Sequence, residues 1–132
     1  MTDVGSLAPW AAATRRVDKP WGYELIWAVT DIYVGKVLFV KAGESLSLQY
    51  HEQKDESWLI QSGRARIELG AVGDETLAEE VVGAGAAFHY TPGTVHRITA
   101  VEDTTILEVS TPHLDDVVRL EDLYGRQGTS AP

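Results

Sequence analysis

Four polar side chains of the kinds that bind metal ions lie in two stretches of the chain. Gln49 and His51 are two residues apart, so on a strand their side chains leave the same face. Glu56 follows across a charged turn, and His96 comes from a stretch further along the chain. Two imidazole nitrogens, a carboxylate and an amide oxygen make a plausible set of ligands for one divalent metal ion. The residue types therefore predict a metal site.

The elements that must position these side chains are strands. Strand patterns and turn signals alternate at spacings of about 8 to 12 residues, which indicates a sandwich or barrel. The run at 33–40 is rich in branched and aromatic residues, as expected of a buried strand. Because 132 residues hold a single domain, we predict one all-β domain at residues 18–126. An N-terminal arm at 1–17 and a frayed tail at 127–132 complete the chain.

One segment departs from the strand pattern. Leu114, Val117, Val118 and Leu120 are closer to helical spacing, so we expect a short C-terminal helical segment there.

The row of Leu46, Leu48 and Tyr50 is expected to lie opposite the ligand row on its strand. This apolar row needs a cover. A second sheet or a second subunit could supply that cover, and we expect a homodimer.

The composition excludes several classes of protein. With a net charge of −9 and no basic patch, the chain is not expected to bind nucleic acid. The absence of cysteine excludes a disulfide framework, a zinc ribbon and a cysteine nucleophile. No apolar run is long enough for a signal peptide or a membrane helix, so we expect a cytoplasmic protein with no membrane partner. A small anionic substrate is compatible with the overall charge.

The spacing of the candidate ligands resembles that of the cupin superfamily. In its first motif Gln49, His51 and Glu56 lie between Gly43 and Gly63, with Gln49 where the family usually has its first histidine. The second motif is matched by Gly85, Gly93 and His96, although Thr91 takes its proline slot and Pro92 comes one place late. The resemblance implies a double-stranded β-helix, the cupin jelly-roll barrel.

The motif slots separate the histidines into two groups. His51 and His96 occupy ligand slots, whereas His89 and His113 occupy none, so we expect those two to be ordinary hydrogen-bonded residues. Gln49 could ligate through its amide oxygen or hydrogen-bond a bound water. Because an amide is a harder and weaker donor than an imidazole, copper is disfavoured and Zn, Mn, Fe, Co and Ni remain open. Open coordination positions would make the site catalytic.

A narrower resemblance covers most of the chain. KPWGYE at 19–24, GESLSLQYH at 43–51 and DDVVRLEDLYGR at 115–126 resemble the cupin domain of type II mannose-6-phosphate isomerases. That family usually has a His-rich run with an arginine before the glutamate, and this chain has Glu-Gln-Lys at 52–54 instead. It also tends to have His after the glutamate, where this chain has Ser57.

The resemblance implies aldose–ketose isomerisation of a sugar phosphate through a metal-stabilised enediolate. Lys36 and Lys54 are the predicted substrate-binding residues. Lys36 lies within a strand and points either outward or into the pocket, whereas Lys54 is expected to reach the pocket mouth. Arg97 is a further candidate, but it adjoins His96 on a strand and should face away from the metal. The sequence does not identify the catalytic base.

Two other functions remain open, because a fold does not fix a function. One is a different metal-dependent enzyme on the same barrel, such as an Fe(II) dioxygenase, a lyase or a cyclase. The other is a non-catalytic sugar-binding module, which would bind its ligand without turnover.

Overall fold

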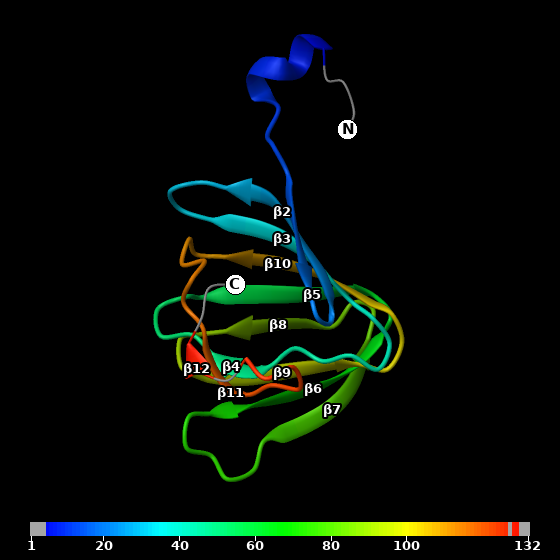
Figure 1. The fold of residues 1–132 in the computed structure, drawn as a ribbon, viewed down its shortest axis with the longest axis vertical. Coiled ribbons are helices and arrows are strands. Elements are labelled where there is room, and N and C mark those ends of the chain that lie inside the picture. Colours follow the sequence, from blue (N-terminus) through cyan, green and yellow to red (C-terminus); the bar gives the residue numbers. More distant parts are fainter. Residues whose placement is uncertain (1–4, 127, 130–132) are drawn as a thin grey trace.

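Two antiparallel six-stranded sheets pack face to face and form a barrel (Figure 1). The structure is a computed structural model that describes residues 5–126, 128 and 129. The first sheet consists, in order, of β1 (Arg15–Lys19), β2 (Gly22–Val29), β3 (Val34–Val40), β10 (Thr104–Ser110), β5 (Glu56–Ser62) and β8 (Ala87–Tyr90). The second consists of β12 (Gly128–Thr129), β11 (Val118–Glu121), β4 (Leu48–Tyr50), β9 (Thr94–Ala100), β6 (Arg64–Ala71) and β7 (Ala78–Gly83).

The core lies between the two sheets and follows the alternation of each strand. Trp58, Ile60 and Ile106 point inward from the first sheet, and Ile67 and Ile98 point inward from the second. All five are at most 3% exposed. The period of two puts every second residue of a strand against the facing sheet. The predicted all-β jelly-roll fold is confirmed.

The predicted C-terminal helical segment is wrong. Val118–Glu121 forms strand β11, which pairs antiparallel with β4. Arg119 on this strand is buried while Leu120 is exposed, so the polarity of the strand is the reverse of an ordinary surface strand. The hydrophobic pattern of β11 therefore did not indicate which face of the strand points into the barrel. Backbone pairing with β4 outweighs the local helical pattern, because tertiary context routinely overrides it.

Helical structure in the described part of the chain is confined to the 3-10 helix η1 (Gly5–Trp10). No helix there is long and apolar enough to cross a membrane. Figure 1 shows η1 projecting away from the barrel. The expected boundary between arm and domain, at residues 17 and 18, falls inside β1. In the expected tail, Gly128–Thr129 pairs with β11, and residues 127 and 130–132 lie outside the described residues.

The expected apolar row opposite the ligands is only partly correct. Leu46 packs inside the barrel with the core, because regular pairing of β4 begins only at Leu48. Before that point the chain makes an isolated bridge between Ser45 and Thr99, so the alternation is interrupted. Leu48 is buried and Tyr50 is half-buried.

Gly63, a glycine of the first motif, allows the tight turn between β5 and β6. Its φ of 96° lies in the left-handed region. A Cβ at this position would lie 2.3 Å from the backbone oxygen of Asp103. We expect Gly63→Ala to be destabilising both through the backbone conformation and through this clash.

Urea unfolding of Gly63→Ala and Gly73→Ala separates the two effects. Gly73 has a similar φ of 91°, but nothing lies within 4 Å of a Cβ built there. Gly73→Ala should cost about 1–2 kcal/mol for the left-handed backbone. Gly63→Ala should cost roughly 1–3 kcal/mol more because of overpacking. Equal losses for the two variants would show that the Asp103 carbonyl moves aside without cost.

Candidate metal centre and ligand pocket

Three of the four predicted metal ligands converge inside the barrel. His51 follows β4 and His96 lies on β9 of the second sheet, whereas Glu56 begins β5 of the first sheet. The Nε2 atoms of His51 and His96 lie 3.4 and 3.1 Å from Glu56 Oε1, and all three residues are at most 5% exposed. The candidate ligand atoms all lie within 4.8 Å of one another. This group could hold a metal ion.

Backbone carbonyl groups fix the protonation of both imidazoles. The Nδ1 atom of His51 contacts the carbonyl oxygen of Asp116, and Nδ1 of His96 lies 2.9 Å from that of Thr94. A carbonyl oxygen can only accept, so each Nδ1 must carry the proton and donate it. In the neutral ring the lone pair is then on Nε2, the atom that faces Glu56.

The Nε2 atoms and Glu56 Oε1 are buried and make no hydrogen bonds among the described residues. Buried polar atoms are normally paired with the protein, an ordered water or a bound ion, so three unpaired atoms facing one another are a donor set that a bound group would complete. Two imidazole nitrogens and a carboxylate oxygen match the donor preferences of Zn, Fe, Co and Ni. The residues therefore fit a divalent metal ion.

Gln49 lies beside these ligands. It is opposite His96 in the register of β4 and β9, and it lines the adjoining pocket. Its Oε1 accepts a hydrogen bond of 2.7 Å from Ser47 Oγ. Both predicted alternatives, direct ligation and hydrogen bonding to a bound water, remain compatible with this position.

Aromatic rings hold His96 in place. The Tyr90 ring stacks on the imidazole with centroids 4.3 Å apart, and the Trp58 ring meets it edge-on at 5.5 Å. The Tyr90 hydroxyl is buried without a hydrogen bond. Burial raises the pKa of Tyr90, and the nearby Glu56 and Glu108 raise it further, so Tyr90 stays a neutral phenol.

Asp116 organises the loop that joins β4 to β5. Its carboxylate accepts hydrogen bonds from the backbone N–H groups of residues 52, 53 and 54, at 2.9, 2.7 and 2.8 Å. Its carbonyl oxygen orients His51. Burial alone would raise the pKa of Asp116, but the three N–H groups and His51 lower it. One residue thus fixes both the loop and a candidate ligand.

Lys54, which was expected at the pocket mouth, lines the pocket from inside the barrel. It is 6% exposed, and its Nζ lies 2.8 Å from Glu56 Oε2 and 3.3 Å from Glu108 Oε2. Burial alone would lower the pKa of Lys54, but the two carboxylates raise it. Burial alone would raise the pKa of Glu56, but Lys54 holds it well below its usual value. The pKa of Lys54 is raised because the carboxylates of Glu56 and Glu108 are both close enough to stabilise its charged ammonium.

Lys36 points into the barrel, which decides between its two predicted orientations. It is 2% exposed, and its Nζ lies 3.4 Å from Glu24 Oε1. Glu24 Oε2 is buried and makes no hydrogen bond. Arg97 faces away from the ligands, as predicted, and its guanidinium binds Glu68 at 2.9 and 3.1 Å.

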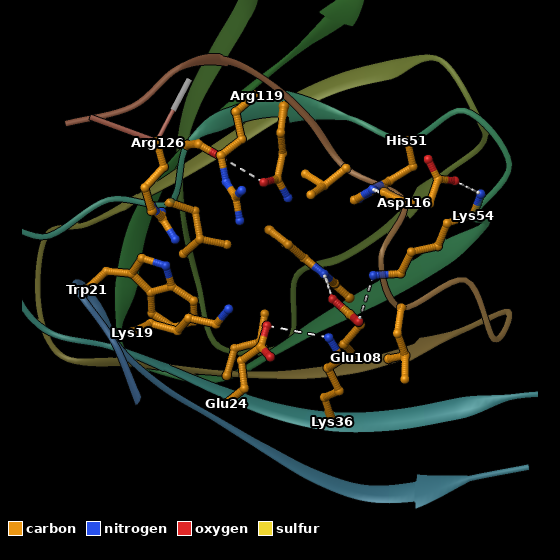
Figure 2. A pocket seen from close by; sticks show the side chains of 17 residues that line it. Lys19, Trp21, Glu24, Lys36, His51, Lys54, Glu108, Asp116, Arg119 and Arg126 are labelled. Carbon is orange, nitrogen blue, oxygen red and sulfur yellow. Dashed lines mark hydrogen bonds and ion pairs between the residues drawn. The ribbon is translucent and has the colours of Figure 1, made fainter. Parts of the chain in front are cut away.

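A pocket opens beside the metal candidates (Figure 2). Its space is about 520 Å³ when the open mouth is included. The lining contains the cationic residues Lys19, Lys36, Lys54, Arg119 and Arg126, and the acidic residues Glu24, Glu108 and Asp116. Glu56 and Asp122, just outside the lining, pair with Lys54 and Arg126, so the charges balance, but Arg119 and Lys19 form no ion pair with the described residues. The pocket therefore favours an anionic ligand.

The comparisons with known proteins identify the family of this chain. A family model described as the C-terminal domain of mannose-6-phosphate isomerase matches residues 10–122. The chain belongs to this family. The match covers the candidate ligands and most of the pocket lining, with Arg126 beyond its end.

The curated relatives are longer proteins that contain this mannose-6-phosphate isomerase C-terminal domain. Mannose-1-phosphate guanylyltransferase ManC of Salmonella typhimurium is 36% identical over 118 residues, which are 85% of this chain and 23% of ManC. Xanthan biosynthesis protein XanB of Xanthomonas campestris pv. campestris is 33% identical over 118 residues, which are 85% of this chain and 24% of XanB. The chain thus spans about a quarter of the length of these relatives.

Solved structures share the barrel of this family domain. The capsular polysaccharide assembling protein CapF of Staphylococcus aureus has a TM-score of 0.69 at 22% identity, covering 83% of this chain and 35% of CapF. KdgF of Halomonas sp. has a TM-score of 0.64 at 22% identity, covering 76% of this chain and 88% of KdgF. At this identity the likeness shows the fold alone, and that fold is the cupin barrel.

Several pocket residues of the family domain were not predicted from the sequence. Lys19, Trp21 and Glu24 line the pocket from the N-terminal part of the chain, and Arg119 and Arg126 line it from the C-terminal part. All five lie in KPWGYE or DDVVRLEDLYGR, the outer two segments that carry the resemblance to the isomerases. The resemblance was therefore a usable signal, but hydrophobic pattern alone did not show that these side chains face inward.

The other two histidines of the domain have ordinary partners. His89 Nε2 lies 2.7 Å from Asp55 Oδ1 at the surface. His113 Nδ1 lies 2.9 Å from Thr111 Oγ1. Neither belongs to the metal candidate group, as the motif spacing predicted.

Replacing Asp116 should lower the free energy of unfolding, by an amount that depends on pH, because Asp116 holds the loop between β4 and β5. Asp116→Asn removes charged acceptors from three backbone N–H groups, and we expect a loss of about 1–3 kcal/mol near pH 7. Because the pKa of Asp116 is lower in the folded than in the unfolded protein, its contribution is fully present above the unfolded pKa of about 3.9. It is lost as the pH falls through the folded pKa.

Urea unfolding from pH 7 downward measures this difference. The gap between the wild-type protein and Asp116→Asn should shrink below about pH 4. Asp115→Asn is the control, because Asp115 is an exposed neighbour with the same formal charge. A gap that stays constant over the acid range would contradict the assignment of the effect to the Asp116 carboxylate.

Proposed function

We propose that this domain is a metal-dependent isomerase that interconverts an aldose phosphate and a ketose phosphate, of the mannose 6-phosphate and fructose 6-phosphate type. The observation that carries this proposal is the convergence of two imidazole Nε2 atoms and Glu56 beside a pocket lined by five cationic side chains. Membership of the mannose-6-phosphate isomerase C-terminal family supports the choice of sugar phosphate. The curated relatives bear other activity names, and the proposal concerns this domain by itself.

His51, Glu56 and His96 would hold the metal ion, with Gln49 as a fourth ligand or as the partner of a bound water. A bound Zn, Mn, Fe, Co or Ni ion would polarise the carbonyl oxygen of the sugar and so lower the energy of the enediolate. Lys54 keeps Glu56 charged and in position from the other side. Trp58 and Tyr90 exclude water from His96 by covering it.

A proton must move between C1 and C2 of the sugar, and we propose Glu24 as the residue that carries it. Glu24 lines the pocket and is 8% exposed. Its Oε1 is held by Lys36, whereas its Oε2 is buried without a hydrogen bond and can accept a proton. Glu108 lines the same pocket, but both its oxygens are engaged, by Trp58 Nε1 at 2.9 Å and by Lys54. A positioned carboxylate of this kind contributes about 10²–10⁴-fold to such a proton transfer.

We further propose that the protein forms a homodimer in which the arm of one copy covers the first sheet of the other. Leu7 and Trp10 on the arm are 62% and 80% exposed, and the arm projects from the barrel (Figure 1). Leu59 and Val109 line a shallow apolar groove on the outer face of the first sheet. A second copy supplies the apolar segment that this groove lacks.

Elemental analysis and a coupled isomerase assay test the metal-dependent reaction. His96→Ala should lose both the bound metal and the activity, because one of three ligands is removed. Glu24→Gln should keep the metal and lose about 10²–10⁴-fold in kcat. Glu80→Gln, at an exposed position on β7, is the matched control and should change neither.

Three results would decide against the proposal. Full activity after complete chelation would exclude the metal-dependent mechanism. Binding of metal and sugar phosphate without turnover would indicate a non-catalytic sugar-binding module. Oxygen consumption with Fe(II), giving a product that contains new oxygen, would indicate a dioxygenase.

Light scattering during size-exclusion chromatography tests the homodimer. The wild-type protein should have twice the mass of the chain, and Trp10→Ser should raise the dissociation constant by roughly 30-fold or more, as loss of an interface tryptophan does. Val72→Ser, at an exposed position outside the groove, is the control. A wild-type protein that is monomeric at all concentrations would refute this arrangement.

A further inference from the structure

Arg119 lies in a row with two residues of the candidate metal centre. In the second sheet Arg119 on β11 is opposite Gln49 on β4, and Gln49 is opposite His96 on β9. Neighbouring strands are about 4.8 Å apart, so the backbone of Arg119 is on the order of 10 Å from that of His96. A six-carbon sugar with a terminal phosphate spans such a separation.

The charge of Arg119 has no counter-charge in contact with it. Arg119 is 6% exposed, and its Nε and Nη1 atoms are buried without a hydrogen bond. No carboxylate of the described residues forms an ion pair with it. Asp122 and Glu24 stabilise its charge without forming an ion pair with it, so the buried guanidinium lacks the contacts that normally accompany such burial.

Three other cationic side chains of the pocket differ from Arg119 in this respect. Lys36 is paired with Glu24, Lys54 with Glu56 and Glu108, and Arg126 with Asp122. These lysines, which the sequence suggested for substrate binding, are thus already neutralised within the protein. An incoming anion gains less from a cation that already has a carboxylate partner.

Two more cationic groups lie on the same side of the pocket as Arg119. Figure 2 shows Arg126 and Lys19 there, with His51, Lys54 and Glu108 across the pocket from them. Asp122 anchors Arg126 through two hydrogen bonds of 3.0 and 3.1 Å. Burial lowers the pKa of Arg119 and the charge of Arg126 lowers it further, while Asp122 and Glu24 oppose part of this shift. This mutual repulsion is what a bound anion would relieve.

We propose that Arg119, Arg126 and Lys19 form a subsite for a phosphomonoester dianion, at the end of the pocket away from the metal candidates. The proposal rests on the proposed isomerase function and names the part of the pocket that holds the phosphate. A planar carboxylate can be bound by the two parallel N–H donors of one guanidinium. A tetrahedral phosphate group presents three oxygens in different directions and can accept hydrogen bonds from several cationic side chains. Three cationic groups from β1, β11 and the segment after β11 suit the phosphate.

Calorimetric titration with glucitol 6-phosphate tests the subsite, because this compound has no carbonyl group and cannot be isomerised. The wild-type protein should bind it, and Arg119→Met should weaken binding by about 10- to 150-fold, the value of a charge-assisted hydrogen bond. The affinity of Arg119→Lys should lie between those of the wild-type protein and Arg119→Met, because lysine keeps the charge and loses the bidentate hydrogen bonding of the guanidinium. Arg64→Met, at an exposed position on β6, removes the same charge and should leave the affinity within about twofold.

Thermal unfolding distinguishes a binding role of Arg119 from a structural one. Without ligand, Arg119→Met should raise the Tm, because an apolar side chain replaces a buried and unpaired cation. A lower Tm would show that Arg119 stabilises the fold and would overturn the proposal. Inorganic phosphate should raise the Tm of the wild-type protein and leave that of Arg119→Met unchanged.

Two further comparisons complete the test. Tighter binding of glucuronate than of glucitol 6-phosphate would overturn the assignment to a phosphate. If glucitol 6-phosphate binding depends on Arg119 while no isomerisation occurs, the subsite stands and the isomerase function fails. If isomerisation occurs with an unchanged KM in Arg119→Met, the function stands and the subsite is wrong.

Discussion

The burial of the Glu56 carboxylate is the constraint around which this barrel is built. Glu56 is 1% exposed, and an isolated charge in such a place costs several kcal/mol. Lys54 at 2.8 Å compensates part of the cost but is shared with Glu108, which is also buried. Two carboxylates and one ammonium leave the cluster one positive charge short. A cation at the two imidazoles would supply it, and the adjoining pocket would then become still more attractive to an anion.

Unpaired polar atoms gather around this constraint instead of being scattered through the fold. Among the described residues, the buried side-chain atoms without a hydrogen bond belong to Glu24, His51, Glu56, Tyr90, His96, Ser110 and Arg119. Ser110 is opposite Glu56 in the strand register, and the others line the pocket or surround the candidate ligands. The rest of the interior follows the ordinary rules of packing and pairing. Places where those rules fail together are expected to be functional.

The sequence predicted the barrel and the His51, Glu56 and His96 group because both depend on spacing along strands. On a regularly alternating strand, a fixed interval between two residues determines whether their side chains point to the same face. It did not predict the role of the C-terminal segment, where Arg119 points inward and Leu120 outward, since hydrophobicity normally indicates the opposite. The position of Lys54 was also missed. The neighbouring strand β10 brings Glu108 to it, and Glu108 together with Glu56 explains why this lysine is buried.

The metal candidates and the cationic end of the pocket come from different parts of the chain. The metal candidates lie on or beside β4, β5 and β9, none of which is an edge strand. The groups at the cationic end come from β1 at the edge of the first sheet and from β11 and the segment that follows it. Side chains near a sheet edge have fewer packing partners, so they can change while the central strands keep their register. A barrel of this kind can therefore keep one set of metal ligands and exchange the groups that choose the substrate, which is why the fold alone does not identify the reaction.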